Sequence, residues 1–408
     1  MSAGPAAAAS AGAPALAAAP APIPPIPLGK AGLPERKVPR TISPGVDITT
    51  VFRGDKPARA SAIGTTQYGP WAVRLVVIDP KKTKARLRTT FGTDIARTDL
   101  VTELARRTDS IVSMNGSFFS LGRSPQAPGD PVGFAMYGGS VVSKQTGTVG
   151  EYNVMIDSAA SRLRFGKYTW SAYTQNKATG TRLSIDDVNT VTAVPAGCED
   201  KADQSECGSR GQVVRFTPLF ASRTPAGPGV EVVLDRRGCV ARVSSKRGTN
   251  LAVSQTSLQA TGRRAVELAE AATRGSCMLT VERVFDDKGR RVSFDRNTYA
   301  VSGRFRLLVD GQIATGLTGR SISGRNPRSV IGTLPDGKIG FLNIDGRSVK
   351  SVGATLTETA RVAKALGFRD AVNLDGGGST VLVAGTTLLN TYSGSRMRAV
   401  SDVIILAP

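Results

Sequence analysis

The sequence predicts an α+β fold, with a large mixed β-sheet core, few helices and a single folded domain behind a disordered N-terminal segment. The 408 residues are 40% hydrophobic and 21% charged, a balance that can bury a sizeable core and excludes a wholly disordered chain. Most apolar segments are short runs rich in Val and Ile and bounded by Gly, Pro or Asp, which is typical of strands. Few segments have helical spacing, and the chain contains no tandem repeat.

The N-terminal segment has the composition of a linker. Residues 1–29 carry no charge and consist almost entirely of Ala, Pro, Gly and Ser, so they cannot form a packed core. We therefore expect residues 1–40 to be a disordered linker and residues 41–408 to fold. The segment lacks a basic start and a compact apolar region, so it is not an intact signal peptide. It is similar to the spacer that often follows one, which indicates a mature exported protein.

Strands dominate the first half of the predicted domain. Residues 99–107 place apolar side chains at helical spacing, which predicts one short helix among them. The Gly138-Gly139 pair predicts the turn of a hairpin over residues 132–142. The other strands expected in this half are 71–78, 86–91, 111–114, 152–156 and 162–165.

The second half is also mainly β, with two predicted helices. Residues 263–272 form an amphipathic segment that follows a glycine. Thr355 and Glu358 have capping-box spacing, which begins a helix that continues to about residue 366. The strands expected in this half are 211–216, 230–234, 277–284, 329–332, 339–344, 371–374, 380–383 and 400–406.

The four cysteines indicate disulfide bonds. Cys198 and Cys207 flank a polar loop, so we expect residues 193–211 to be a disulfide-stapled insertion. Cys239 and Cys277 would then pair across two strands. Four cysteines allow three connectivities, of which we favour this nearest-neighbour pairing; four buried free thiols are the alternative. Because disulfides need an oxidising compartment, the expected location is secreted or periplasmic.

The charge balance is strongly basic, with 53 Lys and Arg residues against 32 Asp and Glu and a formal net charge of +21. Such a surface could attract an anionic glycan, a phosphodiester or an envelope polymer, or it could be a solvated Arg-rich surface without a partner. Nucleic acid is not an expected partner, because the basic residues are scattered and the longest cluster, residues 80–86, has the composition of a turn. No apolar run reaches the ~18 residues of a membrane span, so no transmembrane segment is expected.

The chain contains no histidine. This absence excludes Ser-His-Asp and Cys-His triads, a histidine general base and the HExxH zinc site. Any catalysis must therefore use carboxylates, Lys, Arg, amides, hydroxyls or backbone groups. We expect neither a metal nor a cofactor, and the sequence leaves the oligomeric state open.

A run of three glycines lies between two predicted strands, directly after Asp375. Each glycine costs roughly 0.5–1 kcal/mol against alanine in an ordered element, so the run indicates a close approach of the backbone to another group or a positive φ. Turning N–H groups there can hold an anion beside the carboxylate. The alternative is a tight turn with a solvated Asp. The run is neither a Walker loop nor a dinucleotide-binding turn.

Three further motifs place polar side chains next to predicted strands. Asn115 follows the strand 111–114 and either faces a cleft or caps a turn. Arg325 and Arg328 precede the strand 329–332, where a guanidinium can hold phosphate or carboxylate through two hydrogen bonds or simply lie on the surface. A polar loop, residues 390–401, leads into the last strand.

These motifs resemble, in chain order, those of the phosphodiester glycosidase family. The most specific match is Asn-Leu-Asp-Gly-Gly-Gly-Ser at residues 373–379, which is reproduced without change. One departure is Thr333, which stands where the best-known family member has a histidine. The resemblance extends from about Trp71 to the C-terminus, and its other pieces are Asn115–Phe119, Arg328–Gly332, Asp345–Arg347, Leu356–Ala360 and Arg398–Ser401.

The resemblance implies one catalytic domain that hydrolyses a glycosidic bond, often one whose leaving group is a phosphodiester. The expected substrate is a sugar-1-phosphodiester or a related anionic envelope glycan. Two alternatives stay open. One is a glycosidase acting on a neutral envelope polysaccharide. The other is a secreted glycan-binding protein without turnover, which the missing histidine supports.

The resemblance also implies roles for individual residues. Asp375 would be the carboxylate at the anomeric carbon, acting as nucleophile or as base for water. Glu358 is a second candidate catalytic carboxylate, although its capping-box position favours a structural role. Arg328 and Arg398 would hold the anion. Asn115 and Asn373 would orient the sugar, and the turn residues Gly376, Gly377, Gly378 and Ser379 would contribute backbone groups.

Overall fold

The protein is α+β and mostly β, as predicted. A computed structural model describes residues 23–121, 124–201, 203–319 and 322–408. Three α-helices lie within these ranges, at each of the three places where the sequence predicts one: α1 (Val101–Arg107), α2 (Arg263–Ala271) and α3 (Leu356–Ala365). The strands are distributed over five sheets. In the described ranges the strands pair antiparallel except for β12 (Asp187–Val188) with β13 (Val213–Phe216).

The largest sheet has eight strands and is antiparallel throughout rather than mixed. Its central strands are buried on both faces because each face is covered by other elements. The strand order is β1 (Glu35–Ser43), β2 (Val46–Arg53), β3 (Trp71–Ile78), β22 (Ile339–Ile344), β21 (Arg328–Thr333), β23 (Asp370–Asn373), β19 (Arg306–Val309) and β20 (Gln312–Ile313).

A second sheet packs on one face of the large sheet. Buried side chains of both sheets, among them Phe341 and Met114, meet in one cluster between them. The second sheet has the order β25 (Thr387–Leu388), β24 (Leu382–Ala384), β5 (Val112–Asn115), β26 (Asp402–Ala407) and β4 (Arg86–Phe91). The pair of sheets forms a β-sandwich that brings the ends of β5, β21 and β23 together.

One helix covers each outer face of the sandwich. Helix α3 buries Leu356 and Val362 against the large sheet, in a cluster that also contains Val330. Helix α1 buries Val101 and Leu104 against the second sheet. The resulting layers are helix, sheet, sheet and helix, and each amphipathic helix supplies one apolar face to the core.

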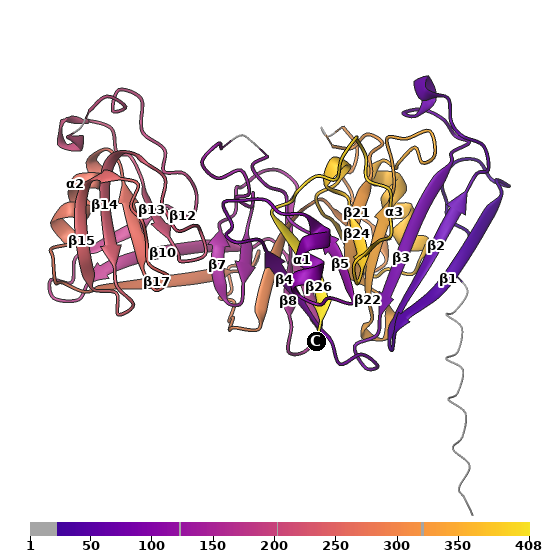
Figure 1. Cartoon of the computed structure of the whole chain (residues 1–408), viewed down its shortest axis with the longest axis horizontal. Helices are drawn as coiled ribbons and strands as arrows, with labels where there is room; N and C mark the ends of the chain where they lie inside the picture. Colours follow the sequence, from indigo (N-terminus) through magenta and orange to yellow (C-terminus); the bar gives the residue numbers. More distant parts are fainter. Residues whose placement is uncertain (1–22, 122–123, 202, 320–321) are drawn as a thin grey trace, which may run out of the picture.

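The remaining sheets extend the sandwich to one side and form a lobe, which lies at the left of Figure 1 around α2. Met155 of the adjoining sheet and Trp170 of the lobe belong to one buried cluster, so the core is continuous between them. The adjoining sheet consists of β6 (Ala135–Tyr137), β7 (Ser140–Ser143), β8 (Glu151–Asp157), β9 (Arg162–Gly166) and β18 (Thr298–Arg304). The lobe contains β12, β13, β10 (Thr169–Asn176), β11 (Arg182–Ile185), β14 (Gly227–Leu234), β15 (Val240–Arg247), β16 (Thr256–Ala260) and β17 (Met278–Phe285).

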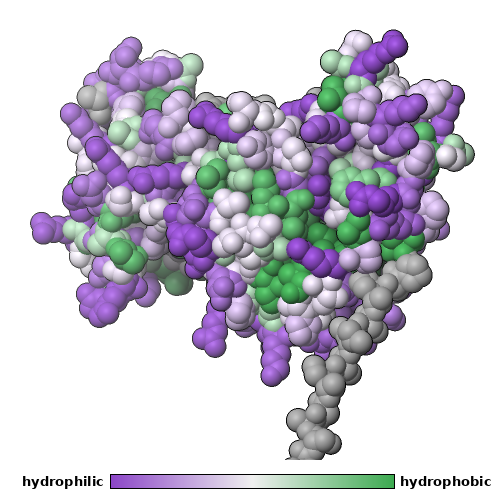
Figure 2. Space-filling model, turned by 45° about the vertical axis from the view of Figure 1, so that its right-hand side comes forward, coloured by the Kyte–Doolittle hydropathy of each residue, from purple (hydrophilic) through white to green (hydrophobic). Residues whose placement is uncertain are grey.

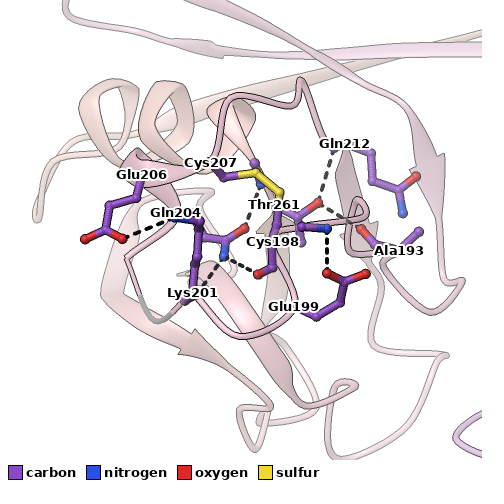
Figure 3. The surroundings of a disulfide bond; sticks show 11 residues. Ala193, Cys198, Glu199, Lys201, Gln204, Glu206, Cys207, Gln212 and Thr261 are labelled. Atoms are coloured by element: carbon purple, nitrogen blue, oxygen red, sulfur yellow. Dashed lines mark hydrogen bonds and ion pairs between the residues drawn. A yellow bond between two sulfur atoms is a disulfide. The ribbon is translucent and has the colours of Figure 1, made fainter.

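Both expected cysteine pairs lie at disulfide-bonding distance, with Cα–Cα separations of 5.6 Å for Cys198–Cys207 and 3.8 Å for Cys239–Cys277. The first bridge closes a loop against the start of α2 (Figure 3). Gln204 in this loop is buried; its side chain accepts a hydrogen bond from the Gly262 N–H at 2.8 Å and donates to the Cys198 carbonyl. The stapled loop therefore caps the N-terminal end of α2, where N–H groups lack helical partners.

The folded chain begins before residue 41, which corrects the expected end of the linker. Residues 1–22 lie outside the described part. Ile26 and Leu28 are 1% and 0% exposed and pack in the same cluster as Trp71. Arg53 donates to the Leu28 carbonyl, and β1 starts at Glu35. Two buried aliphatic side chains at a Pro-rich stretch thus tie the segment 23–34 to the sheet.

Hydrophilic side chains cover both ends of the molecule, and hydrophobic ones gather over the middle of the face shown in Figure 2. In the described ranges, no helix combines the length and the apolar character that crossing a bilayer requires.

Candidate active site

A cavity of about 430 Å³ opens where β5 and β23 end and β21 begins. Among the described residues that line it, Asp375 is the one carboxylate, and three are arginines. The cavity is thus electropositive around a single acidic group. Its described lining residues are Phe118, Leu121, Ile322, Asn326, Arg328, Arg347, Asn373, Asp375, Gly376, Gly377, Gly378 and Arg398.

Each glycine of the turn after Asp375 has its own steric reason. A Cβ on Gly376 would lie 2.8 Å from the Pro327 carbonyl oxygen. Gly377 has a φ of +59°, which favours glycine, and a Cβ there would lie 2.9 Å from the Arg347 guanidinium. A Cβ on Gly378 would lie 2.6 Å from the guanidinium of Arg398. The triplet therefore lets two guanidiniums approach the backbone beside Asp375.

The backbone N–H groups of this turn mostly donate within the protein. The N–H of Gly376 donates to the Asp375 carboxylate at 2.9 Å, and that of Gly377 donates to the Pro327 carbonyl at 3.0 Å. The Ser379 N–H donates to the Gly376 carbonyl at 3.1 Å. Three N–H groups of the turn are thus used within the protein, and the same turn leaves room beside Asp375 for two arginine side chains.

Burial raises the pKa of Asp375 from the ordinary 3.8 to about 6. The hydrogen bonds from Ser379 and the Gly376 N–H, together with the charges of Arg398 and Arg304, oppose this shift without cancelling it. The carboxyl is consequently ionised at neutral pH and protonated under mildly acidic conditions. A carboxylate with this pKa at a cavity wall can act as a nucleophile or a base.

The side chain of Asn115 fixes the Asp375 turn through hydrogen bonds. It is 1% exposed, and its side-chain amide donates to the Asp375 carbonyl at 2.7 Å. Its Oδ1 accepts from the Ser329 hydroxyl at 2.6 Å and from the Val381 N–H at 3.2 Å. All three contacts are to the protein, so Asn115 joins β5 to β21 and to the turn, and it is absent from the described cavity lining.

Asn373 does line the cavity. Its amide nitrogen donates to the carbonyls of Arg304 and Leu374, at 3.2 and 2.9 Å. Its Oδ1 is buried and has no hydrogen-bond partner in the described part of the chain. An unpaired buried acceptor costs about 1–3 kcal/mol.

The three arginines of the cavity are held differently. The Arg328 guanidinium is buried and donates to the carbonyls of Ile322, Gly324 and Ala354 at 2.6–2.9 Å, so most of its donors fix neighbouring loops. Burial, and then the charge of Arg347, lower the pKa of Arg328 to about 10.

The other two guanidiniums are less occupied by protein acceptors. Arg398 reaches the Ser379 hydroxyl at 3.5 Å, and Arg347 donates twice to Asn326 Oδ1, at 2.7 and 3.0 Å. Sequence reasoning singled out Arg398 but not Arg347. In the sequence, the Asp345-Gly346-Arg347 motif could have drawn attention to Arg347. In the structure, Arg347 has a positive φ of 59°.

Glu358 is absent from the described lining of the cavity. It completes the expected capping box with Thr355 and forms a 2.7 Å ion pair with Arg325. Burial on its own would raise the pKa of Glu358, but the hydrogen bonds from Arg325 and Thr355 outweigh it and lower the pKa. These contacts give Glu358 a structural role at the start of α3, outside the lining of the cavity.

A buried acid that the sequence did not indicate supports the Asn115 segment. Asp402 begins β26 and is 0% exposed, and burial raises its pKa. Its Oδ1 accepts from the Ser117 N–H at 2.6 Å, and the Tyr137 hydroxyl donates to its Oδ2. Because its partners come from two segments that are distant in sequence, the sequence alone held no local signal for it.

Residues 228–407 match the phosphodiester glycosidase family, which confirms the resemblance for this part of the chain. The match contains the Asp375 turn, Asn373 and all three arginines of the cavity, whereas Asn115 lies outside it. No curated protein sequence matches the chain.

Two of the solved structures that match the chain illustrate the shared fold. A protein of Burkholderia pseudomallei K96243, described as a candidate exported protein, superimposes with a TM-score of 0.78 and 21% identity, covering 95% of this chain and 99% of its own. A hypothetical protein from Synechocystis gives a TM-score of 0.66 and 20% identity over 88% of this chain and 62% of its own. At these identities the likeness is one of fold.

A third structure is the catalytic domain of zebrafish N-acetylglucosamine-1-phosphodiester alpha-N-acetylglucosaminidase, auto-inhibited by its pro-peptide. It has 14% identity and a TM-score of 0.41, with 92% of this chain and 88% of that chain covered.

Proposed function

Because residues 228–407 match the phosphodiester glycosidases, we propose that this chain is an exported glycoside hydrolase that cleaves a sugar-1-phosphodiester or a related anionic envelope glycan. One observation carries the proposal. Asp375 shares a cavity of about 430 Å³ with Arg347 and Arg398, whose guanidiniums approach the same glycine turn. A carboxylate beside two cations suits a reaction in which a sugar carbon becomes positive while a phosphate leaves.

The reaction is a hydrolysis at the anomeric carbon. The bond between this carbon and the bridging phosphate oxygen breaks, and the oxygen of water takes its place. Asp375 either attacks the carbon first or removes a proton from the water, and a phosphate monoester leaves with the electron pair of the broken bond. This leaving group is a weak base, so the step needs less protonation than the departure of a sugar alkoxide. The chain therefore does not require a histidine acid.

Each residue around the cavity receives a role in this proposal. Arg347 and Arg398 bind the phosphoryl oxygens, because a planar guanidinium can donate two parallel hydrogen bonds to them. Asn373, which lines the cavity, orients the sugar. Arg328 and Asn115 are positioning residues, since their polar atoms mostly contact backbone carbonyls and strand groups.

Export is supported by two observations. Two cysteine pairs lie at bonding distance, and disulfides persist in oxidising compartments. The Burkholderia protein that shares the fold over 95% of this chain is itself described as a candidate exported protein.

The proposal is tested with a substrate panel. Purified protein is assayed on aryl glycosides of common sugars and on methyl phosphodiesters of the matching sugar 1-phosphates. We expect the phosphodiesters to give the higher kcat/KM. Replacing Arg398→Lys should raise KM mainly for the phosphodiesters, because a point charge replaces a two-pronged donor. Equal effects on both substrate classes would favour a glycosidase of neutral polysaccharides.

A glycan-binding protein without turnover is the second candidate. It is favoured by the presence of a single carboxylate among the described cavity residues, because most glycosidases use two. Binding of a sugar 1-phosphate with no product released from any member of the panel would establish it.

A further inference from the structure

A second cavity, of about 870 Å³, adjoins the candidate active site. The two cavities share Leu121 and Arg398 in their walls, so they adjoin at these two side chains, and we call the two together the groove. The added part runs along the loop that precedes the last strand and is lined by apolar Phe119 and Met397 and by the exposed Arg396.

The positions of Asp375 and Arg398 indicate which half of the substrate each cavity would bind. Asp375 lies in the first cavity and Arg398 lies at the boundary between the two. If Asp375 acts at the anomeric carbon and Arg398 binds the phosphate, the sugar lies in the first cavity. The other half of the phosphodiester must then extend past Arg398 into the second cavity, whose volume is about twice as large, 870 against 430 Å³.

The charge of the second cavity points to the chemistry of this other half. Among the described residues that line it there is no Asp or Glu, and Arg396 adds a positive charge beyond Arg398. A side chain such as Phe119 or Met397 can pack against the apolar face of a sugar ring. The exposed guanidinium of Arg396 can bind a second anion, at the linkage that follows the scissile one.

We propose that the second cavity binds the leaving-group half of the substrate, and that this half is a chain of sugars joined by phosphodiesters, with Arg396 binding the phosphate that follows the scissile one. This inference rests on the proposed function and specifies its substrate class. Hydrolysis then releases one sugar from the chain end, and the shortened chain, which now ends in a phosphate monoester, leaves the groove.

The test compares three synthetic substrates that carry the sugar selected by the panel. The first is its 1-phosphate methyl ester, the second a trimer joined by phosphodiesters, and the third a single scissile phosphodiester attached to a neutral trisaccharide. We expect kcat/KM for the charged trimer to exceed that for the methyl ester at least about tenfold. This gain should shrink as salt is added, because exposed charge contacts are screened.

Arg396→Gln should lower kcat/KM for the charged trimer about fivefold, as expected for loss of one exposed charge contact, and should affect the neutral-chain substrate less than twofold. Arg242→Gln is the matched control, because it removes the same charge from an exposed position on β15 in the lobe. Equal kcat/KM for the methyl ester and the charged trimer would overturn the proposal. An equal effect of Arg396→Gln on both long substrates would overturn the assignment of a second anion.

A binding measurement separates failure of the groove from failure of the proposed function. Calorimetric titration of Asp375→Asn protein with the charged trimer and with the methyl ester needs no turnover. Binding of the trimer at least about tenfold tighter supports the groove, and equal affinities overturn it. If the wild-type protein hydrolyses none of the three substrates, the proposed function fails, whatever the titration shows.

Discussion

At the residue scale, the centre of the site is a carboxylate surrounded by features that raise and lower its pKa. Burial moves the pKa of Asp375 up to about 6, and Arg398 and Arg304 limit that shift. Gly377 and Gly378 matter because they let guanidiniums lie against the turn. In the proposed function, the missing side chains of Gly377 and Gly378 therefore matter as much as the carboxylate of Asp375.

The close approach at Gly378 predicts a specific defect. Gly378→Ala places a Cβ 2.6 Å from the Arg398 guanidinium, which must move away, whereas the backbone of Gly378 has no positive φ and accepts alanine. We expect kcat/KM for phosphodiesters to fall about a hundredfold with little change in melting temperature. Gly64→Ala is the control, since nothing lies within 4 Å of its Cβ. Unchanged kinetics in Gly378→Ala would remove Arg398 from the site.

The raised pKa of Asp375 predicts the pH dependence of activity. If the ionised form reacts, kcat/KM should fall as the pH drops through about 6. The stability effect has the opposite sign. Because the folded pKa lies above the ordinary 3.8, ionisation of Asp375 disfavours the folded state above pH 6, and this cost disappears as the pH falls toward 4. Rate profiles and melting curves across this range check both trends, and an acid limb centred near pH 4 would contradict the assignment.

Individual site residues could be predicted from the sequence where a local motif marked them. Asp375, Asn373 and Arg398 stood out through the glycine run and the loop before the last strand, and all three line the cavity. Arg347 lay within the Asp345–Arg347 motif but was not singled out, and Asp402 lay outside every motif. Their relevance comes from contacts with Gly377 and Ser117, which are distant in sequence and meet through tertiary packing.

At the element scale, helix α3 illustrates how a motif carboxylate can be structural. Its first turn is closed by the capping box of Thr355 and Glu358, and the Glu358 side chain also pairs with Arg325. Arg325 in turn packs over the Trp71 ring at 5.6 Å. The helix start is thereby fixed to β3 and to the loop that leads into β21.

Glu358→Gln separates a structural role from a catalytic one. Glutamine retains the capping-box oxygen and removes the charge that pairs with Arg325. We expect the free energy of unfolding to fall by about 1–3 kcal/mol, because a mostly buried guanidinium loses its ionic partner, while kcat stays within about twofold. Urea unfolding and steady-state kinetics measure the two effects. A hundredfold loss of kcat in folded protein would return Glu358 to the catalytic residues.

Most of the predicted elements have a clear apolar period, but the interior strands β2, β16 and β18 were missed although most of their residues are buried. All three helices were predicted because their apolar faces and their ends were marked. Strand β15 was not predicted, because as an edge strand in the lobe it is exposed along most of its length and rich in Ser, Lys and Arg. Strand β1 was missed for the same reason, since it is polar and largely exposed at the edge of the large sheet. Edge strands do not bury two faces, so they lack the hydrophobic signal of central strands.

At the scale of the whole molecule, one buried cluster joins the lobe to the adjoining sheet, another joins that sheet to the sandwich, and the cavity lies at one end of the sandwich. The fold class was predictable from the composition and from the many short apolar runs typical of strands, but the pairing of the strands was not. Strands β3 and β22 are neighbours although more than two hundred and fifty residues separate them, as their register Val73↔Ile344 shows. Such pairings depend on packing over the whole chain rather than on any local pattern.

The N-terminal segment provides a prediction at this scale. Protein that begins at residue 31 lacks Ile26 and Leu28, which are buried against the large sheet. Two buried aliphatic side chains are worth roughly 3–6 kcal/mol, so its free energy of unfolding should fall by about this amount. Protein that begins at residue 23 is the control and should keep the stability of the full chain. Equal stability of the two truncated proteins would show that these contacts contribute nothing.

The central claim is that Asp375 acts on the anomeric carbon, and the most direct test is the kcat of Asp375→Asn on a sugar-1-phosphodiester. The substitution keeps the shape of the side chain and removes its charge. We expect kcat to fall about a thousandfold or more, while substrate affinity stays within about tenfold and the melting temperature at pH 8 does not fall. Asp336→Asn, an exposed turn residue, should behave like the wild type. Near-normal kcat in Asp375→Asn would contradict the account.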